Sequence, residues 1–573
     1  LVRSRGLGDV YKRQIQYDAS GGAPEEAALY LELSAQQTRL TSRCYQALAI
    51  MAASPYGDIL DADAGEGAAD SLMGYRGLTE EEAALYEEED RLIQTYDQIM
   101  EQGVPVLAEG RIWTAESLES AGVDGETYEA VSQALAEERY RAAGEVYLQL
   151  VRLRAEQAQW AGYDDYAEYA YEALYTRDYG LEDAADLHRL AKRYILPLQL
   201  RLLEETSEQE LRALSVRSRM DGEEVLDAIQ PFAEGFDREM GETFRFLRDH
   251  HLYDIEYGEA KLPTGYTVAL PAYGSAFIFN SPYGDYQDLS DTVHEFGHFF
   301  ETFHCAQHDL WTDFNIDVGE IHSQALELIF AGQAEELFGE RYGEAYRNAV
   351  LYNILDSILD GCLYDEFQTA AYQNPEMTAE ELNRLFKALS EDYGYSYGPG
   401  VDADPAWVEN AHNFQNPLYF ISYATSALSA LDLWFLYLDR PREAKETYLE
   451  LSALSLSMPY MAAVEEAGLR DIFEPETVPA LSETLEEYLD GRPISYGEQR
   501  GGTAGRFEEI LLILCFVLVA LGAVLRLRRA QRQRAERRRD ANDPWPSQER
   551  RETFRRSGPD PWSGQDKKPP WEL

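Results

Sequence analysis

Residues 294–298 of this chain are His-Glu-Phe-Gly-His, an H-E-x-x-H motif. On a helix, positions four apart share a face, so His294 and His298 can hold one metal ion while Glu295 stands beside it. A catalytic zinc site takes three protein ligands and leaves its fourth position to water. The motif therefore predicts one zinc ion that activates water, with Glu295 as the general base.

A third ligand must come from another element, and Glu320 follows His298 by 22 residues. The hypothesis is that a second helix brings this carboxylate to the imidazole pair. A competing interpretation is that residues 317–320 start a helix, with Glu320 at the third helical position of a cap. Glu327 lies two turns further along the same face and could orient a metal-bound histidine, or it could simply be solvated.

A different third ligand is also conceivable, because His304 stands at the interval of a three-histidine zinc site and Met458 could supply its Met-turn. That site needs Gly at the position where Glu301 stands, so that the helix can turn back. With Glu301 the helix should continue and carry His304 away from the metal. The sequence therefore favours Glu320.

Peptide hydrolysis also needs hydrogen-bond donors for the developing oxyanion, usually Tyr or His side chains. His412, Tyr419 and Tyr423 are candidates because they form a compact downstream group. By position alone they would be ordinary core aromatics. Their role depends on whether the fold brings them to the metal site.

The charge is unevenly distributed along the 573 residues, whose net charge is −54. Residues 526–573 hold 14 Lys/Arg against 8 Asp/Glu, so the preceding body carries about −60. Such a body should repel nucleic acid, and its field either serves solubility alone or attracts cationic peptides. The 4 cysteines show no paired spacing, which predicts neither a disulfide framework nor a cysteine zinc site.

Helical patterns dominate residues 22–260 and return after Glu320 as far as residue 490. Residues 262–281 instead favour short strands bounded by Gly and Pro, directly before the metal motif. We expect an N-terminal helical region at 22–260 and a catalytic region at 261–490. Residues 1–14 are expected to be non-native and are excluded from the fold.

An apolar run with no polar face occupies residues 510–525 and predicts a transmembrane helix at 510–527, after a linker at 491–509. Eight arginines follow between Arg526 and Arg539. By the positive-inside rule, this single-pass protein of the cell membrane has its body outside and its tail in the cytoplasm. The basic tail, 528–573, repeats Asp-Pro-Trp and is expected to be disordered. It could dock a cytoplasmic partner or simply be biased in composition.

Several stretches together resemble one family, that of thimet oligopeptidase and oligoendopeptidase F. Residues 152–179, with their final Arg-Asp-Tyr, are similar to a helical segment and turn of the family, and residues 274–298 to its strand leading into the metal motif. Glu320-Ile-His-Ser resembles its third-ligand motif. Residues 407–423 resemble its substrate-binding segment, with Phe420 where many members have another tyrosine. The resemblance covers about residues 22–490.

The resemblance implies a mainly α, two-lobed zincin-type metallopeptidase with a deep substrate channel and a small sheet beside its active site. It implies His294, His298 and Glu320 as ligands of one zinc ion and Glu295 as the base. It also implies that His412, Tyr419 and Tyr423 contact the substrate or the oxyanion. Gly274, Ser275 and Ala276 would belong to an edge strand, residues 274–279, that pairs with the substrate backbone.

The expected function is that of a membrane-anchored zinc oligoendopeptidase acting on oligopeptides. One alternative is a carboxydipeptidase on the same scaffold, which differs in how the channel ends. The other is a non-catalytic peptide-binding surface protein that keeps the pocket without turnover.

Overall fold

The computed structural model describes residues 15–16, 19–20, 24–54, 59, 79–108, 110–258, 261–262, 264–270, 275–305, 315–395, 406–454 and 458–496. These residues fall in one compact unit that ends at Tyr496. The predicted transmembrane helix, residues 510–527, and the tail lie outside the described residues, as do residues 1–14.

The N-terminal part is built almost entirely from helices. Gly162 ends the longest of them in a left-handed conformation, at φ 95°, and Asp221 caps the helix that begins at Gly222. Its elements are α2 (Pro24–Ala52), α5 (Glu80–Gln102), α6 (Ala115–Ser120), α7 (Gly125–Ala161), α8 (Tyr166–Tyr169), the π-helical turn η1 (Ala170–Leu174), α9 (Leu181–Leu190), the π-helical turn η2 (Ala191–Ile195), α10 (Leu196–Glu205), α11 (Glu208–Arg217), α12 (Gly222–Phe236) and α13 (Arg238–Asp249).

Two small sheets interrupt the helices. An antiparallel hairpin, β1 (Val106–Ala108) and β2 (Arg111–Trp113), lies within the region predicted to be helical. Its three-residue strands are too short to show an alternating pattern in the sequence. The second sheet has the order β3-β5-β4, with β3 (Tyr253–Asp254), β4 (Gly265–Leu270) and β5 (Ser275–Asn280). Strands β4 and β5 lie at the predicted place, whereas β3 lies in the region predicted to be helical.

The remaining chain returns to helices, as the sequence predicts. Its elements are α14 (Gln287–Cys305), α15 (Ile316–Phe330), the 3₁₀ turn η4 (Ala331–Gln333), α16 (Ala334–Phe338), α17 (Glu340–Gln373), α18 (Ala379–Asp392), the 3₁₀ turn η5 (Ala406–Glu409), α19 (His412–Gln415), α20 (Ile421–Asp439), α21 (Pro441–Leu454), α22 (Tyr460–Glu466) and α23 (Thr477–Leu489).

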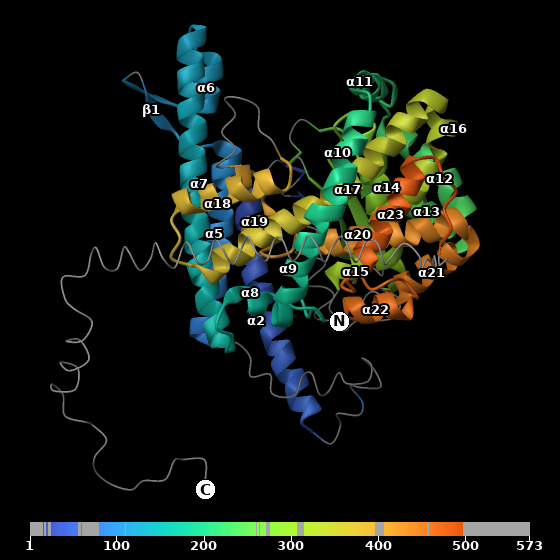
Figure 1. Ribbon diagram of the computed structural model, residues 1–573. Helices are drawn as coiled ribbons and strands as arrows, with labels where there is room; N and C mark the ends of the chain where they lie inside the picture. The colour runs from blue at the N-terminus through green and yellow to red at the C-terminus, as the bar shows by residue number, and fades with distance from the viewer. Residues whose placement is uncertain are drawn as a thin grey trace, which may run out of the picture. The chain divides into compact units, whose positions relative to one another are not determined.

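One hydrophobic core extends through both predicted regions, from Leu92 to Leu485. In Figure 1, α5, α7 and α18 lie side by side, and α15 packs against α14 and α20. Among the described helices, only α20 is long and apolar enough to cross a membrane, and 83% of its apolar window is buried inside the protein. It is therefore a core helix of this unit.

Candidate active site

Helix α14 carries the two histidines on one face and packs its opposite face into the core. Phe296 and Phe299 are fully buried, whereas the His294 and His298 rings are only partly covered. The two Nε2 atoms lie 3.1 Å apart. A tetrahedral zinc ion with bonds of about 2.0–2.1 Å would separate two ring nitrogens by roughly 3.3 Å. The ring pair is therefore spaced as two ligands of one ion.

Helix α15 brings Glu320 to this pair because the two helices approach closely. A Cβ added at Gly297 would lie 2.8 Å from the Ser323 Cα, so only glycine permits this contact. Glu320, one turn before Ser323, places its Oε2 atom 3.4 Å from the Nε2 atoms of His294 and His298. Within the described chain, these three residues are the group whose ligand atoms could hold a metal, all within 4.8 Å.

The electrostatics of this group favour a cation. Burial lowers the pKa of His294, but hydrogen bonds with Glu320 and Glu327 outweigh it and raise the pKa well above its usual value. Burial raises the pKa of Glu320, and the charges of the two histidines outweigh that effect and lower it well below its usual value. Two nitrogens and a carboxylate that together attract positive charge fit the donor set of a catalytic zinc site.

The capping interpretation of Glu320 is wrong. Asn315 caps α15 by accepting a hydrogen bond from the Asp317 backbone N–H, and Glu320 is the fifth residue of the helix. Glu327 lies two turns after Glu320, and its Oε1 is 2.7 Å from the His294 Nδ1. This contact leaves the Nε2 lone pair of His294 turned towards the metal position, as expected of a carboxylate that orients a ligand ring.

Helix α14 continues through Glu301 to Cys305, as the presence of Glu at that position predicts. Glu301 is fully buried, with its Oε1 3.7 Å from the His322 Nδ1. The side chain of His304 lies outside the described residues. The continuous helix removes the turn that a three-histidine site would require.

Glu295 is buried beside the histidines and is held by the sheet. The Thr267 hydroxyl on β4 lies 2.7 Å from Glu295 Oε2 and 2.8 Å from its backbone oxygen. Thr267 is not among the site residues predicted from the sequence. The alternation of β4 could have identified it, because every second residue of a strand faces the same side.

The edge-strand prediction for residues 274–279 is wrong in its second half. Strand β5 lies between β3 and β4, and its Ile278 and Phe279 pair with β3 on one side while β4 pairs along the other. Ser275 and Ala276 are buried on β5, ahead of the pairing with β3, and Gly274 lies outside the described residues. Among the described strands, β3 and β4 are the outer strands of this sheet, and β4 is the one that contacts Glu295 through Thr267.

The aromatic segment reaches the site through Tyr419, whose hydroxyl donates to Glu320 Oε1 at 2.9 Å. The His412 ring stacks on Tyr419 with ring centroids 5.3 Å apart and meets the edge of Tyr423 at 6.1 Å. Asn416 Nδ2 lies 3.3 Å from the His412 Nδ1, which assigns the proton of the neutral ring to Nε2. Burial lowers the pKa of His412 to about 4, so this ring is neutral near pH 7.

The backbone before Tyr419 is tightly held. Leu418 has a φ of 60°, which is unusual for a residue with a branched side chain, and its N–H donates to Gln368 at 3.0 Å. The Pro417 carbonyl accepts from the Tyr175 hydroxyl at 2.9 Å, and Arg154 donates to the Phe414 carbonyl. Side chains from the N-terminal region thus fix the segment that carries the candidate donors.

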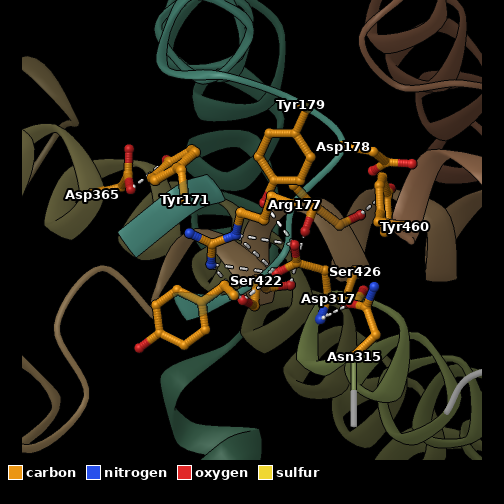
Figure 2. A network of polar contacts seen from close by, with 12 residues as sticks. Tyr171, Arg177, Asp178, Tyr179, Asn315, Asp317, Asp365, Ser422, Ser426 and Tyr460 are labelled. Carbon is orange, nitrogen blue, oxygen red and sulfur yellow. Dashed lines mark hydrogen bonds and ion pairs between the residues drawn. The ribbon is translucent and has the colours of Figure 1, made fainter. Parts of the chain in front are cut away.

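A second buried network holds the start of α15 (Figure 2). Arg177 Nε lies 3.0 Å from Asp317 Oδ2, and Tyr179 donates to the same oxygen at 3.0 Å. Ser422 donates to the other carboxylate oxygen and Ser426 to the Asp317 backbone oxygen. The turn at residues 177–179 is thereby bound to the helix that carries Glu320.

Comparison with solved structures identifies this architecture. The chain matches an oligoendopeptidase F structure with a TM-score of 0.70 and 23% identity, over 85% of this chain and 90% of that one. PZ peptidase A, solved with an inhibitor, matches with a TM-score of 0.70 and 22% identity, over 85% and 91%. An oligoendopeptidase F from Bacillus anthracis str. Ames matches with a TM-score of 0.64 and 22% identity, over 84% and 88%. No protein-family model and no curated protein sequence matches the chain. The chain has the fold of the oligoendopeptidase F structures.

Proposed function

We propose that this protein is a zinc-dependent oligoendopeptidase of the oligoendopeptidase F family, which cleaves internal bonds of short peptides. The observation that carries the proposal is the convergence of His294, His298 and Glu320, with 3.4 Å from the carboxylate oxygen to each ring nitrogen. Glu295 stands beside the two histidines on α14, in a chain with the oligoendopeptidase F fold. One zinc ion is the proposed cofactor.

The residues of this chain would divide the reaction among them. A zinc ion held by the three ligands would polarise the substrate carbonyl and lower the pKa of a bound water to about 7. Glu295 takes a proton from the attacking water at its carboxylate and delivers it to the leaving amine. His412 Nε2–H and the hydroxyls of Tyr419 and Tyr423 are the donors for the developing oxyanion.

Strand β4 is the proposed support for the substrate backbone. It pairs only with β5 among the described strands, so its other edge is free for an added strand. Thr267 ties this strand to the Glu295 carboxylate. A peptide extended along β4 would therefore pass directly beside the general base.

The direct test is Glu295→Gln, assayed on quenched fluorescent peptides together with zinc analysis of the purified protein. Loss of the base should lower kcat at least about a thousandfold, because general-base catalysis and water activation are lost together. Zinc content should stay at one ion per chain, and Glu129→Gln, an exposed change on α7, serves as the matched control. Undiminished turnover in Glu295→Gln would exclude the mechanism.

The two alternatives have separate readouts. A carboxydipeptidase would stop cleaving when the C-terminal carboxylate of the peptide is amidated, whereas an endopeptidase would continue. A non-catalytic binding protein would retain peptides with zinc in place and release no products.

We also propose that residues 510–527 anchor the protein in the cell membrane, with the body outside and the tail free to meet a cytoplasmic partner. The apolar run followed by eight arginines supports this topology. Protease treatment of intact cells should remove the body and spare the tail. A body that survives such treatment would reverse the assignment.

A further inference from the structure

A cavity of about 390 Å³ lies beside the proposed active site. Its walls come from the start of α12, the segment after β3, the end of β5 and the first turns of α14. Asp291 in this wall is three residues before His294, so it lies one turn away on the metal-facing side of α14. Asn280, also in the wall, pairs in register with Gly265 at the end of β4.

Four acidic groups line the cavity together with apolar side chains. Asp221, Glu256, Asp288 and Asp291 contribute carboxylates, and the cationic residue of the lining, Arg219, is exposed to solvent. Two of these carboxylates already accept backbone hydrogen bonds. Asp221 caps α12, and the Asp288 carboxylate accepts backbone N–H groups from the three residues 283–285.

Asp291 and Glu256 have no side-chain hydrogen-bond or ion-pair partner among the residues that the structure describes. Burial, followed by the charge of Glu327, raises the pKa of Asp291 to about 7. A positively charged ligand would offset both effects by keeping the carboxylate ionised. The cavity therefore contains two carboxylates that could each pair with a cation.

The arrangement suits an organic cation better than a metal ion. Among the described residues, His294, His298 and Glu320 are the group that could hold a metal ion, and none of the cavity carboxylates belongs to it. Apolar walls would instead pack against the methylene stem of a long basic side chain while its charged end meets the acids. These walls are formed by Met220, Val225, Ile255, Tyr257, Pro282 and Tyr283.

We propose that this acidic pocket is a specificity subsite that receives a Lys or Arg side chain of the peptide substrate. The inference rests on the proposed peptidase function and on pairing of the peptide with β4. Thr267 and Gly265 of that strand both face Glu295, and Gly265 pairs with Asn280 in the wall of the pocket. These two positions are about 7 Å apart, so the basic residue would lie within about two residues of the cleaved bond.

The test is a set of quenched fluorescent peptides with Lys, norleucine or Glu at each of three positions on either side of the cleaved bond. In the unaltered protein, kcat/KM for Lys over norleucine should be about tenfold at one position, since a partly desolvated charge pair forms there. Asp291→Asn should abolish most of this ratio. Glu256→Lys, a change of an exposed residue, should turn the preference at the same position towards Glu.

Controls separate the pocket from the acidic field of the whole body. Glu129→Gln on α7 changes the net charge as much as Asp291→Asn and should leave the ratio unchanged. Zinc content and thermal unfolding of each variant show whether it is folded and loaded. If peptides are cleaved with equal kcat/KM for Lys and norleucine, or if neither pocket variant changes the ratio, the subsite is overturned while the peptidase function stands.

Two further outcomes have defined meanings. Absence of cleavage of every peptide by the zinc-loaded protein would overturn the proposed function and the subsite with it. A requirement for a free C-terminal carboxylate that disappears in Arg219→Gln would assign the pocket to that carboxylate, and it would overturn the basic subsite.

Discussion

Asp317 and Glu320 are buried carboxylates three residues apart on the same helix, and their surroundings differ. Asp317 is bound by donors of the protein itself, the guanidinium of Arg177 and the hydroxyls of Tyr179 and Ser422 (Figure 2). Glu320 accepts the Tyr419 hydroxyl at Oε1 and the Ser323 hydroxyl at Oε2, but its Oε2 also faces two ring nitrogens at 3.4 Å.

Their different partners indicate that Asp317 is a structural carboxylate and that Glu320 is suited to be a metal ligand. A buried charge that is fully paired is satisfied by the fold and has little capacity for a further partner. A carboxylate beside two imidazole nitrogens forms a group of lone pairs that only a proton or a metal ion satisfies. Burial alone would have assigned the two residues the same role, because Asp317 is 1% exposed and Glu320 5%.

The largest expected effect, on the free energy of unfolding, comes from removing the cationic partner of Asp317. Arg177→Met leaves Asp317 charged and buried without its cation, which should lower the free energy of unfolding by about 3–5 kcal/mol. The double change Arg177→Met with Asp317→Asn should recover part of this loss, because the uncompensated charge is gone. Chemical denaturation of the single and double variants measures both quantities.

The matched change at Glu320 tests whether the two carboxylates differ in role. Glu320→Gln should abolish tight zinc binding and destabilise the metal-stripped protein less than Arg177→Met does. If Arg177→Met unfolds no more easily than Glu320→Gln, the Arg177–Asp317 pair stabilises the fold no more than Glu320 does.

A smaller effect, on zinc affinity, is expected from changing Glu327, the carboxylate that contacts the ligand His294. Glu327→Gln keeps the shape of the side chain but weakens the hydrogen bond to the His294 Nδ1, now 2.7 Å long. Zinc affinity should fall about 10–100-fold, the usual cost of losing such an outer partner. Competition with a chromophoric chelator measures this affinity, and Glu335→Gln on α16 is a control. An unchanged affinity would assign Glu327 to packing alone.

Much of the site follows from local sequence rules. Residues four apart on a helix share a face, and this rule brings His294 and His298 together whatever the rest of the fold does. The continuation of α14 through Glu301 likewise follows from the absence of a glycine there. Glu320 could be predicted as the third ligand only from its motif, because local sequence rules do not indicate which helix packs against α14.

The contacts that the sequence could not predict all depend on tertiary structure. Thr267 meets Glu295 across 28 residues, and Arg177 meets Asp317 across 140. The central place of β5 depends on β3, a strand of two residues with no pattern of its own. Strand order is set by which edges the helices cover, so alternation within β5 cannot reveal whether it is an edge strand.

The smallest predicted effect is a pH dependence confined to the protein stripped of zinc. The pKa of His294 is raised, so its stabilising contribution is complete below its ordinary value of 6.5 and is lost as pH rises through the folded value. The pKa of Glu320 is lowered, so its contribution is present above 4.5 and is lost only as pH falls through its folded value. The stripped site therefore stabilises the fold most between these two pH values.

Zinc replaces the proton that the site otherwise attracts, because only neutral imidazoles bind the ion. From pH 6.5 to 8.5 the unfolding temperature of the chelator-treated protein should fall by about 2 °C more than that of the zinc-loaded protein. Differential scanning calorimetry of both forms measures the slopes, and Glu327→Gln should reduce the difference by removing one source of the raised pKa. Parallel slopes would mean that the imidazole pair carries no extra proton, and that Glu320 resembles Asp317 more closely than the geometry implies.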